Sequence, residues 1–227
     1  MQSSLLLLPG LMCDASVWRD QINHLRQFVN IIVPDLSRAS TPQAMVAAVL
    51  HVAPDSFLLA GHSMGGWVAL EVMRHAPGRV QKLCLANTSA QLDSPEKAQA
   101  RRDMINEAEQ GRTAPLIDQL ARRFVYQKAC LPAVKSILFR NQHALIPQER
   151  AMLMREDCVP LLQTIACQSL VIHSVEDAIF GVSDSEQLVS HMLDAELVII
   201  KKAGHMSLME QPEAFTNALL AWLLKYR

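Results

Sequence analysis

The sequence predicts an α/β fold built on a mostly parallel sheet of about six strands. Short apolar runs alternate along the chain with stretches of helical periodicity, the order typical of such a sheet. The apolar runs are continuous rather than alternating, which indicates strands that helices cover on both faces. The expected strands are Ser4–Leu8, Ile31–Val33, Phe57–Ala60, Val80–Ala86, Leu170–His173 and Leu197–Ile200.

Helix signals separate these strands. Two segments repeat apolar residues at helical spacing, namely Trp18, Ile22 and Leu25 near the start and Phe215, Leu219 and Trp222 near the end. Thr41-Pro42 predicts a helix start, because the hydroxyl can cap and proline is tolerated in a first turn. Ser183 and Glu186 have the spacing of a capping box, which predicts a further helix.

The stretch 91–166 breaks the alternation and contains no convincing strand. Its helical runs are Ala100–Glu109, Leu116–Tyr126 and Pro132–His143. It holds 11 of the 21 Lys and Arg residues, offset by nine acids, which favours solvated helix faces over an anion-binding patch. We therefore expect residues 1–90 and 167–227 to form the core and residues 91–166 to form a helical lid.

Composition excludes several classes of protein. Of the 227 residues, 50% are hydrophobic and 19% charged, which excludes a disordered chain. A net charge of −1 gives no reason to expect nucleic acid binding. The run Leu5–Leu8 is too short for a membrane span and, with no Lys or Arg before it, is a poor signal peptide. Five unclustered cysteines indicate neither a metal site nor a disulfide framework, so we expect a reducing cytoplasm.

The sharpest local motif is Gly61-His62-Ser63-Met64-Gly65, a G-x-S-x-G pattern. It follows an expected strand and precedes the helical run 67–75, which is the strand–turn–helix context that the motif requires. The turn lifts the Ser63 hydroxyl above the sheet, and the two glycines remove Cβ atoms that would collide there. Ser63 is therefore the expected nucleophile.

A serine hydroxyl needs a base, and His205 is the expected one. It follows the strand 197–200 and so lies at the same sheet edge as Ser63, late in the chain as the order Ser, acid, His requires. Other histidines compete less well. His62 lies within the turn and is expected to point away, His173 ends a strand, and His75 and His191 lie near helix ends.

The acid that orients the base is expected to be Asp177, a few residues after the strand 170–173. Glu176 is adjacent and has the same chemistry, and Asp93 follows the strand 80–86, so both stay open as alternatives. An oxyanion needs backbone donors, and two amides are placed to supply them. These are the N–H of Leu11, in the loop after the first strand, and the N–H of Met64, at a helix start.

Together these segments resemble an α/β-hydrolase of the small, cytoplasmic, lidded serine-hydrolase kind. They are similar to the pimeloyl-acyl-carrier-protein methyl ester carboxylesterase-like group over nearly the whole chain, through Leu5–Trp18, Leu58–Leu70, Leu170–Asp177 and Ala203–Phe215. The resemblance implies hydrolysis of a small carboxylic ester or related acyl compound through an acyl-enzyme. It assigns Ser63, His205 and Asp177 as catalytic residues, with Leu11 and Met64 at the oxyanion positions.

The chain departs from the family pattern at three places. Pro9-Gly10 stands where His-Gly is usual, Ser174 stands where the acid loop commonly has glycine, and the first two strands of the family are missing. No phosphate-binding glycine loop occurs, so we expect no cofactor. We expect a small-molecule acyl substrate as partner, and the sequence leaves the oligomeric state open. Two alternatives stay open: carbon–carbon bond cleavage or lyase chemistry by the same residues, and a non-catalytic ligand receptor.

Overall fold

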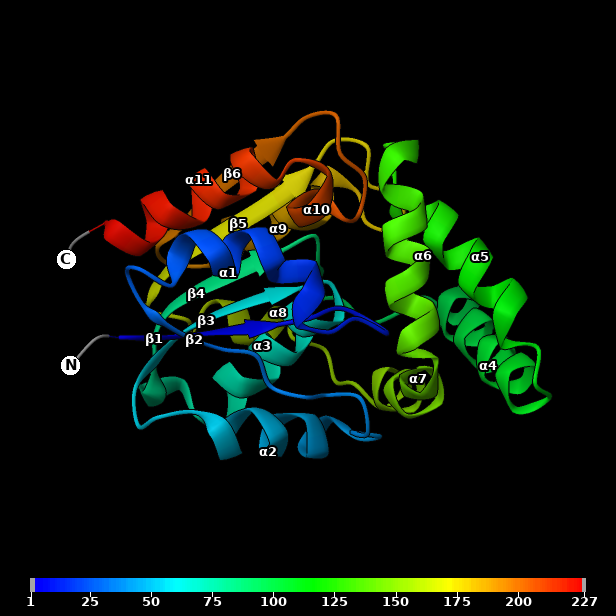
Figure 1. Ribbon diagram of the computed structural model, residues 1–227. Coiled ribbons are helices and arrows are strands. Elements are labelled where there is room, and N and C mark those ends of the chain that lie inside the picture. The colour runs from blue at the N-terminus through cyan, green and yellow to red at the C-terminus, as the bar shows by residue number, and fades with distance from the viewer. Residues whose placement is uncertain (1–2, 226–227) are drawn as a thin grey trace.

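A computed structural model describes residues 3–225 and shows one six-stranded sheet with helices on both faces (Figure 1). All strand pairs are parallel, in the order β2-β1-β3-β4-β5-β6. The strands are β1 (Ser4–Leu8), β2 (Asn30–Ile32), β3 (Phe57–His62), β4 (Val80–Ala86), β5 (Gln168–Ser174) and β6 (Ala195–Ile200). The predicted fold class and all six strands are confirmed, with shifted ends in four of them.

The helices of the core form two layers around this sheet. They are α1 (Arg19–Leu25), α2 (Pro42–Val52), α3 (Met64–His75), α9 (Val182–His191), α10 (Ser207–Glu210) and α11 (Pro212–Leu224). Figure 1 shows α1 and α11 on one side of the sheet and α2 and α3 on the other. Because both faces are covered, the β1 residues Leu5–Leu8 and every residue of β3 are buried, which explains their continuous apolar sequence.

Two of the predicted helix starts have different outcomes. Thr41 caps α2 as expected, and its Oγ1 accepts a hydrogen bond from the Ala44 N–H at 3.1 Å. The capping box at Ser183 and Glu186 is wrong, because α9 begins two residues earlier with Gly181 as its N-cap. Asp184 then occupies the third helical position, where its carboxylate accepts from the Gly181 N–H at 2.9 Å.

Helices fill the segment between β4 and β5. They are α4 (Pro95–Glu109), α5 (Thr113–Phe124), α6 (Leu131–Arg140), α7 (Leu145–Leu153) and α8 (Val159–Leu162). In Figure 1, α4 to α7 gather beyond the ends of the strands that carry the arrowheads. This position puts them over the edge where parallel α/β sheets bind their ligands. Among residues 3–225, no helix combines the length and apolar character needed to cross a bilayer.

Candidate active site

The turn between β3 and α3 holds Ser63 in a rarely populated backbone conformation, with φ 56° and ψ −119°. Close packing on both sides requires glycine. A Cβ on Gly61 would lie 2.2 Å from the Gly65 carbonyl oxygen, and one on Gly65 would lie 2.3 Å from the Leu8 carbonyl oxygen. Such strain persists where the surrounding fold enforces it, and here it places a serine at the carboxyl edge of the sheet.

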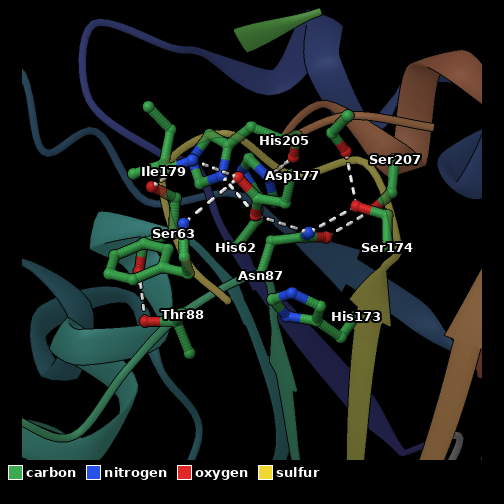
Figure 2. A network of polar contacts seen from close by, with 12 residues as sticks. His62, Ser63, Asn87, Thr88, His173, Ser174, Asp177, Ile179, His205 and Ser207 are labelled. Carbon is green, nitrogen blue, oxygen red and sulfur yellow. Dashed lines mark hydrogen bonds and ion pairs between the residues drawn. The ribbon is translucent and has the colours of Figure 1, made fainter. Parts of the chain in front are cut away.

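Figure 2 shows Ser63, His205 and Asp177 joined in a row of hydrogen bonds. Ser63 Oγ donates to His205 Nε2 at 2.7 Å, and His205 Nδ1 donates to Asp177 Oδ2 at 2.9 Å. The three residues come from the ends of three different strands, and the His205 and Asp177 side chains are almost fully buried. The structure therefore brings together the three side chains that sequence reasoning placed at one sheet edge.

Asp177 is held as an ionised carboxylate. Burial alone would raise its pKa, but the neighbouring His205 and several hydrogen bonds lower the pKa well below its ordinary value. Its Oδ1 accepts from the Ile179 N–H at 2.7 Å, while Oδ2 accepts from Asn87 Nδ2 at 2.9 Å as well as from His205. A carboxylate fixed at both oxygens can orient the imidazole in one tautomer.

Asn87 is a polar residue of the site that sequence reasoning missed. It follows β4, is fully buried and has a positive φ of 45°. Its amide donates to Ser174 Oγ as well as to Asp177, and its Oδ1 accepts from Ser207 Oγ at 2.5 Å. Ser174 Oγ in turn donates to the Gly204 carbonyl oxygen. Ser174, which stands where the family commonly has glycine, thus links the loop that carries Asp177 to the loop that carries His205 (Figure 2).

Replacing Asn87 with alanine is expected to lower kcat about tenfold. The substitution removes one donor from Asp177, one of the two partners of Ser174 Oγ and the acceptor of Ser207 Oγ. A buried polar group left without its partner costs about 1–3 kcal/mol. The measurement is ester hydrolysis by Asn87→Ala, with exposed Asn217→Ala as the matched control. Equal kcat values for the wild type and Asn87→Ala would show that Asp177 needs no such support.

The rival acids have other partners than His205. Asp93 pairs with Arg101 at 2.6 Å and with Arg155 at 2.7 Å. Glu176 Oε2 accepts from the Ala203 N–H at 3.1 Å.

The rival histidines also have other partners. His173 forms a hydrogen bond with Ser185 at 2.9 Å, and His75 and His191 bond to carbonyl oxygens of their own helices. Within residues 3–225, no group of three or more His, Cys, Asp or Glu side chains is arranged to hold a metal ion.

The loop after β1 lies directly against the serine turn. A Cβ on Gly10 would be 3.3 Å from Ser63 Cβ, so glycine lets the two segments approach. Leu11 lines the same pocket as Ser63 and His205, and Met64 opens α3. In the described part of the chain, neither the Leu11 nor the Met64 N–H has a protein acceptor. The next amide, of Met12, donates to Gln148 Oε1 at 2.8 Å, so a buried glutamine from α7 fixes this loop.

The His62 side chain forms no hydrogen bond with the Ser63 hydroxyl, but it packs against His205. Its Nε2 donates to the His205 carbonyl oxygen at 2.8 Å, and the two rings lie 5.0 Å apart. Burial, with a smaller effect of His205, lowers the pKa of His62 to about 3. His62 is therefore a neutral buried support for the backbone of His205.

This buried neutral histidine predicts a loss of stability in acid. An unfolded His62 takes a proton near pH 6.5, whereas the folded one stays neutral down to about pH 3. Between those values the unfolded chain binds more protons, so this group lowers the free energy of unfolding by up to about 1.4 kcal/mol per pH unit as pH falls. His62→Gln should show a shallower pH dependence between pH 6 and 4.5 in urea titrations. Exposed His191→Gln is the control, and equal slopes for all three proteins would contradict the explanation.

A cavity of about 130 Å³ opens at Ser63, between the sheet edge and the helices inserted between β4 and β5, α4 to α8, which we call the insertion. The apolar part of its wall includes Leu11, Met104, Phe124 and Ile179. Charged side chains of the insertion line it as well, namely Asp93, Lys97, Arg101, Arg123 and Glu149. The cavity is smaller than most ligand sites, which favours a small substrate.

The sequence is similar to those of known hydrolases. Residues 5–218 match the sequence model of the Alpha/beta hydrolase family. The chain is 26% identical to 3-oxoadipate enol-lactonase 2 of Acinetobacter baylyi, over 98% of this chain and 89% of that protein. It is 27% identical to the pimeloyl-[acyl-carrier protein] methyl ester esterase of Aromatoleum aromaticum, over 92% and 93% of the two chains.

Solved structures show the same fold. A thermophilic esterase from Thermogutta terrifontis superposes with a TM-score of 0.88 at 24% identity, covering 98% of this chain and 90% of that one. The enol-lactonase from Burkholderia xenovorans superposes with a TM-score of 0.89 at 19% identity, covering 99% and 92%. At these identities the likeness concerns the fold alone.

Proposed function

Because the chain belongs to the alpha/beta hydrolase family, we propose that it is a serine hydrolase that cleaves a small carboxylic ester or related acyl compound. The observation that carries this proposal is the row of hydrogen bonds from Ser63 Oγ to His205 Nε2 and from His205 Nδ1 to Asp177 Oδ2. The row lies at a cavity, so a bound carbonyl carbon would have access to the Ser63 hydroxyl. The names of the relatives, which include an esterase and a lactonase, agree with this chemistry.

In the proposed acylation, Ser63 Oγ attacks the carbonyl carbon while its proton passes to His205 Nε2. The carbonyl oxygen becomes an oxyanion and accepts hydrogen bonds from the Leu11 and Met64 N–H groups. The position of Met64 at the start of α3 also favours negative charge. Asp177 stabilises the imidazolium. As the carbon–oxygen bond to the alcohol breaks, His205 returns the proton to the leaving oxygen, which gives an acyl-Ser63 and a free alcohol.

Deacylation repeats these steps with water as the nucleophile. His205 takes a proton from water, the resulting hydroxide adds to the acyl carbon, and the same two amides hold the oxyanion. Collapse of this intermediate breaks the bond to Ser63 Oγ, which regains the proton from His205. The products are a carboxylic acid and the original protein, so this route draws on no further reactant.

A substrate panel tests the proposal. In a panel of esters, thioesters and vinylogous diketones, the purified chain should hydrolyse p-nitrophenyl acetate or butyrate faster than the diketones. Acyl transfer needs only the three side chains and two amides, whereas cleavage of a diketone must also expel a carbon leaving group. Turnover of the diketones alone would instead favour carbon–carbon bond cleavage. Binding of esters without any turnover would favour a non-catalytic receptor.

A further inference from the structure

Charged side chains crowd the half of the cavity that the inserted helices form. Five of them line it: Asp93, Lys97, Arg101, Arg123 and Glu149. Over the whole insertion, positive and negative residues nearly balance, but their arrangement at the cavity is uneven. Some of these charges are neutralised by a protein partner and others are not.

Both carboxylates at the cavity are neutralised. Arg101 Nε lies 2.6 Å from Asp93 and its Nη1 lies 2.7 Å from Glu149, and Arg155 approaches Asp93 to 2.7 Å. All four side chains are largely buried, with exposures between 0% and 16%. Two guanidinium groups and two carboxylates therefore pair with one another in the cavity wall, and their formal charges balance.

Lys97 and Arg123 remain, and neither forms an ion pair with any residue that the structure describes. Both belong to exposed positions on α4 and α5. The third acid of the neighbourhood, Asp177, lies behind His205 and is not part of the cavity lining. The open side of the cavity thus carries two cations without a counter-ion, although the chain as a whole has a net charge of −1.

Both cations line the same cavity as Ser63 and His205. Lys97 Nζ lies 5.7 Å from the centre of the Phe180 ring, which is itself 5.8 Å from the His205 ring. Arg123 reaches the cavity from α5, the helix that also carries Phe124, whose ring lies 5.1 Å from the His205 ring. The two cations therefore approach one cavity from two different helices.

We propose that the acyl substrate carries a carboxylate a few bonds from the carbonyl that Ser63 attacks, and that Lys97 and Arg123 bind this carboxylate. The inference rests on the proposed function and adds the substrate class to it. A carboxylate at this point would complete two charge-assisted hydrogen bonds, which are among the stronger polar contacts in proteins. The surplus positive charge would also draw an anionic substrate toward the cavity.

A matched pair of esters tests this substrate class. Monomethyl glutarate and methyl pentanoate have the same acyl length and leaving group, but only the first ends in a carboxylate. In pH-stat assays at low salt, kcat/KM for monomethyl glutarate should exceed that for methyl pentanoate by about tenfold, equivalent to roughly 1.4 kcal/mol. Added salt should reduce this ratio, because exposed cations are screened. A ratio of one or less at low salt would overturn the proposal.

Variants locate the effect. The double variant Lys97→Met, Arg123→Met should lose most of the preference for the anionic ester, mainly through KM. Arg122→Met is the matched control. Arg122 is exposed on α5, the helix of Arg123, but it pairs with Asp118 and does not line the cavity. An unchanged preference in the double variant would overturn the assignment to these two residues.

A binding measurement separates this inference from the proposed function. Calorimetry on Ser63→Ala should give a Kd for monomethyl glutarate about tenfold lower than that for methyl pentanoate. If the wild type hydrolyses neither ester, the proposed function fails, yet the calorimetric ratio still decides the anion site. If the wild type hydrolyses both esters equally and the calorimetric ratio is one, the anion site fails and the proposed function stands.

Discussion

Ser63→Ala is expected to lower kcat toward p-nitrophenyl butyrate by about 10⁶-fold, the loss typical when a serine nucleophile of this kind is removed. Alanine has no oxygen that can form the acyl intermediate, and a water molecule in its place lacks the position that the strained turn gives to the hydroxyl. A residual rate above that of water should persist, because the Leu11 and Met64 amides remain to stabilise the oxyanion.

The control is Ser190→Ala, which removes a serine hydroxyl on α9 whose contacts, to Gln187 and His191, are exposed. It should retain wild-type kcat. Circular dichroism and urea titration establish whether both variants fold. A Ser63→Ala protein that retains more than a tenth of the wild-type kcat would refute the role of this serine.

His205→Ala is expected to lower kcat by a similar factor of about 10⁶. Without the imidazole, no group lies within hydrogen-bond distance of Ser63 Oγ to take its proton, since the other described hydrogen bonds at this residue involve its backbone. Because the two side chains act as one unit, their losses should not add. The double variant Ser63→Ala, His205→Ala should therefore be no slower than either single variant by more than about tenfold.

The control is His191→Ala, which removes an exposed histidine at the end of α9. It should leave kcat unchanged. If the losses in kcat of the two single variants added up in the double variant, Ser63 and His205 would assist the reaction independently. That result would contradict proton transfer from Ser63 to His205.

Much of this site could be predicted from the sequence because its signals are local. G-x-S-x-G is a compact pattern, because its glycines are needed for one tight turn of the backbone at the serine. Continuously apolar runs identify buried parallel strands. Once the strands are placed, parallel connectivity puts residues that follow them at one edge, which selected His205 and Asp177. Glu176 could not be separated from Asp177 in this way, since both follow the same strand, and the structure orients them differently.

The supporting residues could not be predicted, for a different physical reason. Asn87 and Gln148 act through hydrogen bonds to partners far away in the sequence, such as Asp177 and Met12 at 90 and 136 positions, and no spacing rule connects such pairs. The short helices α7 and α8 were likewise missed, because proline and mixed polarity obscure their periodicity. In the insertion, charge counts suggested only solvated faces, whereas burial pairs some of the charges and leaves Lys97 and Arg123 beside the cavity.

The most direct test of the central claim is covalent labelling. A fluorophosphonate probe reacts with a serine that a neighbouring base activates, so it reports nucleophilicity without requiring the natural substrate. Intact-mass and peptide mass spectrometry of the labelled protein should find one probe per chain, attached to Ser63, with no label on Ser63→Ala. A folded wild-type protein that stays unlabelled, or one labelled at a different residue, would contradict the account.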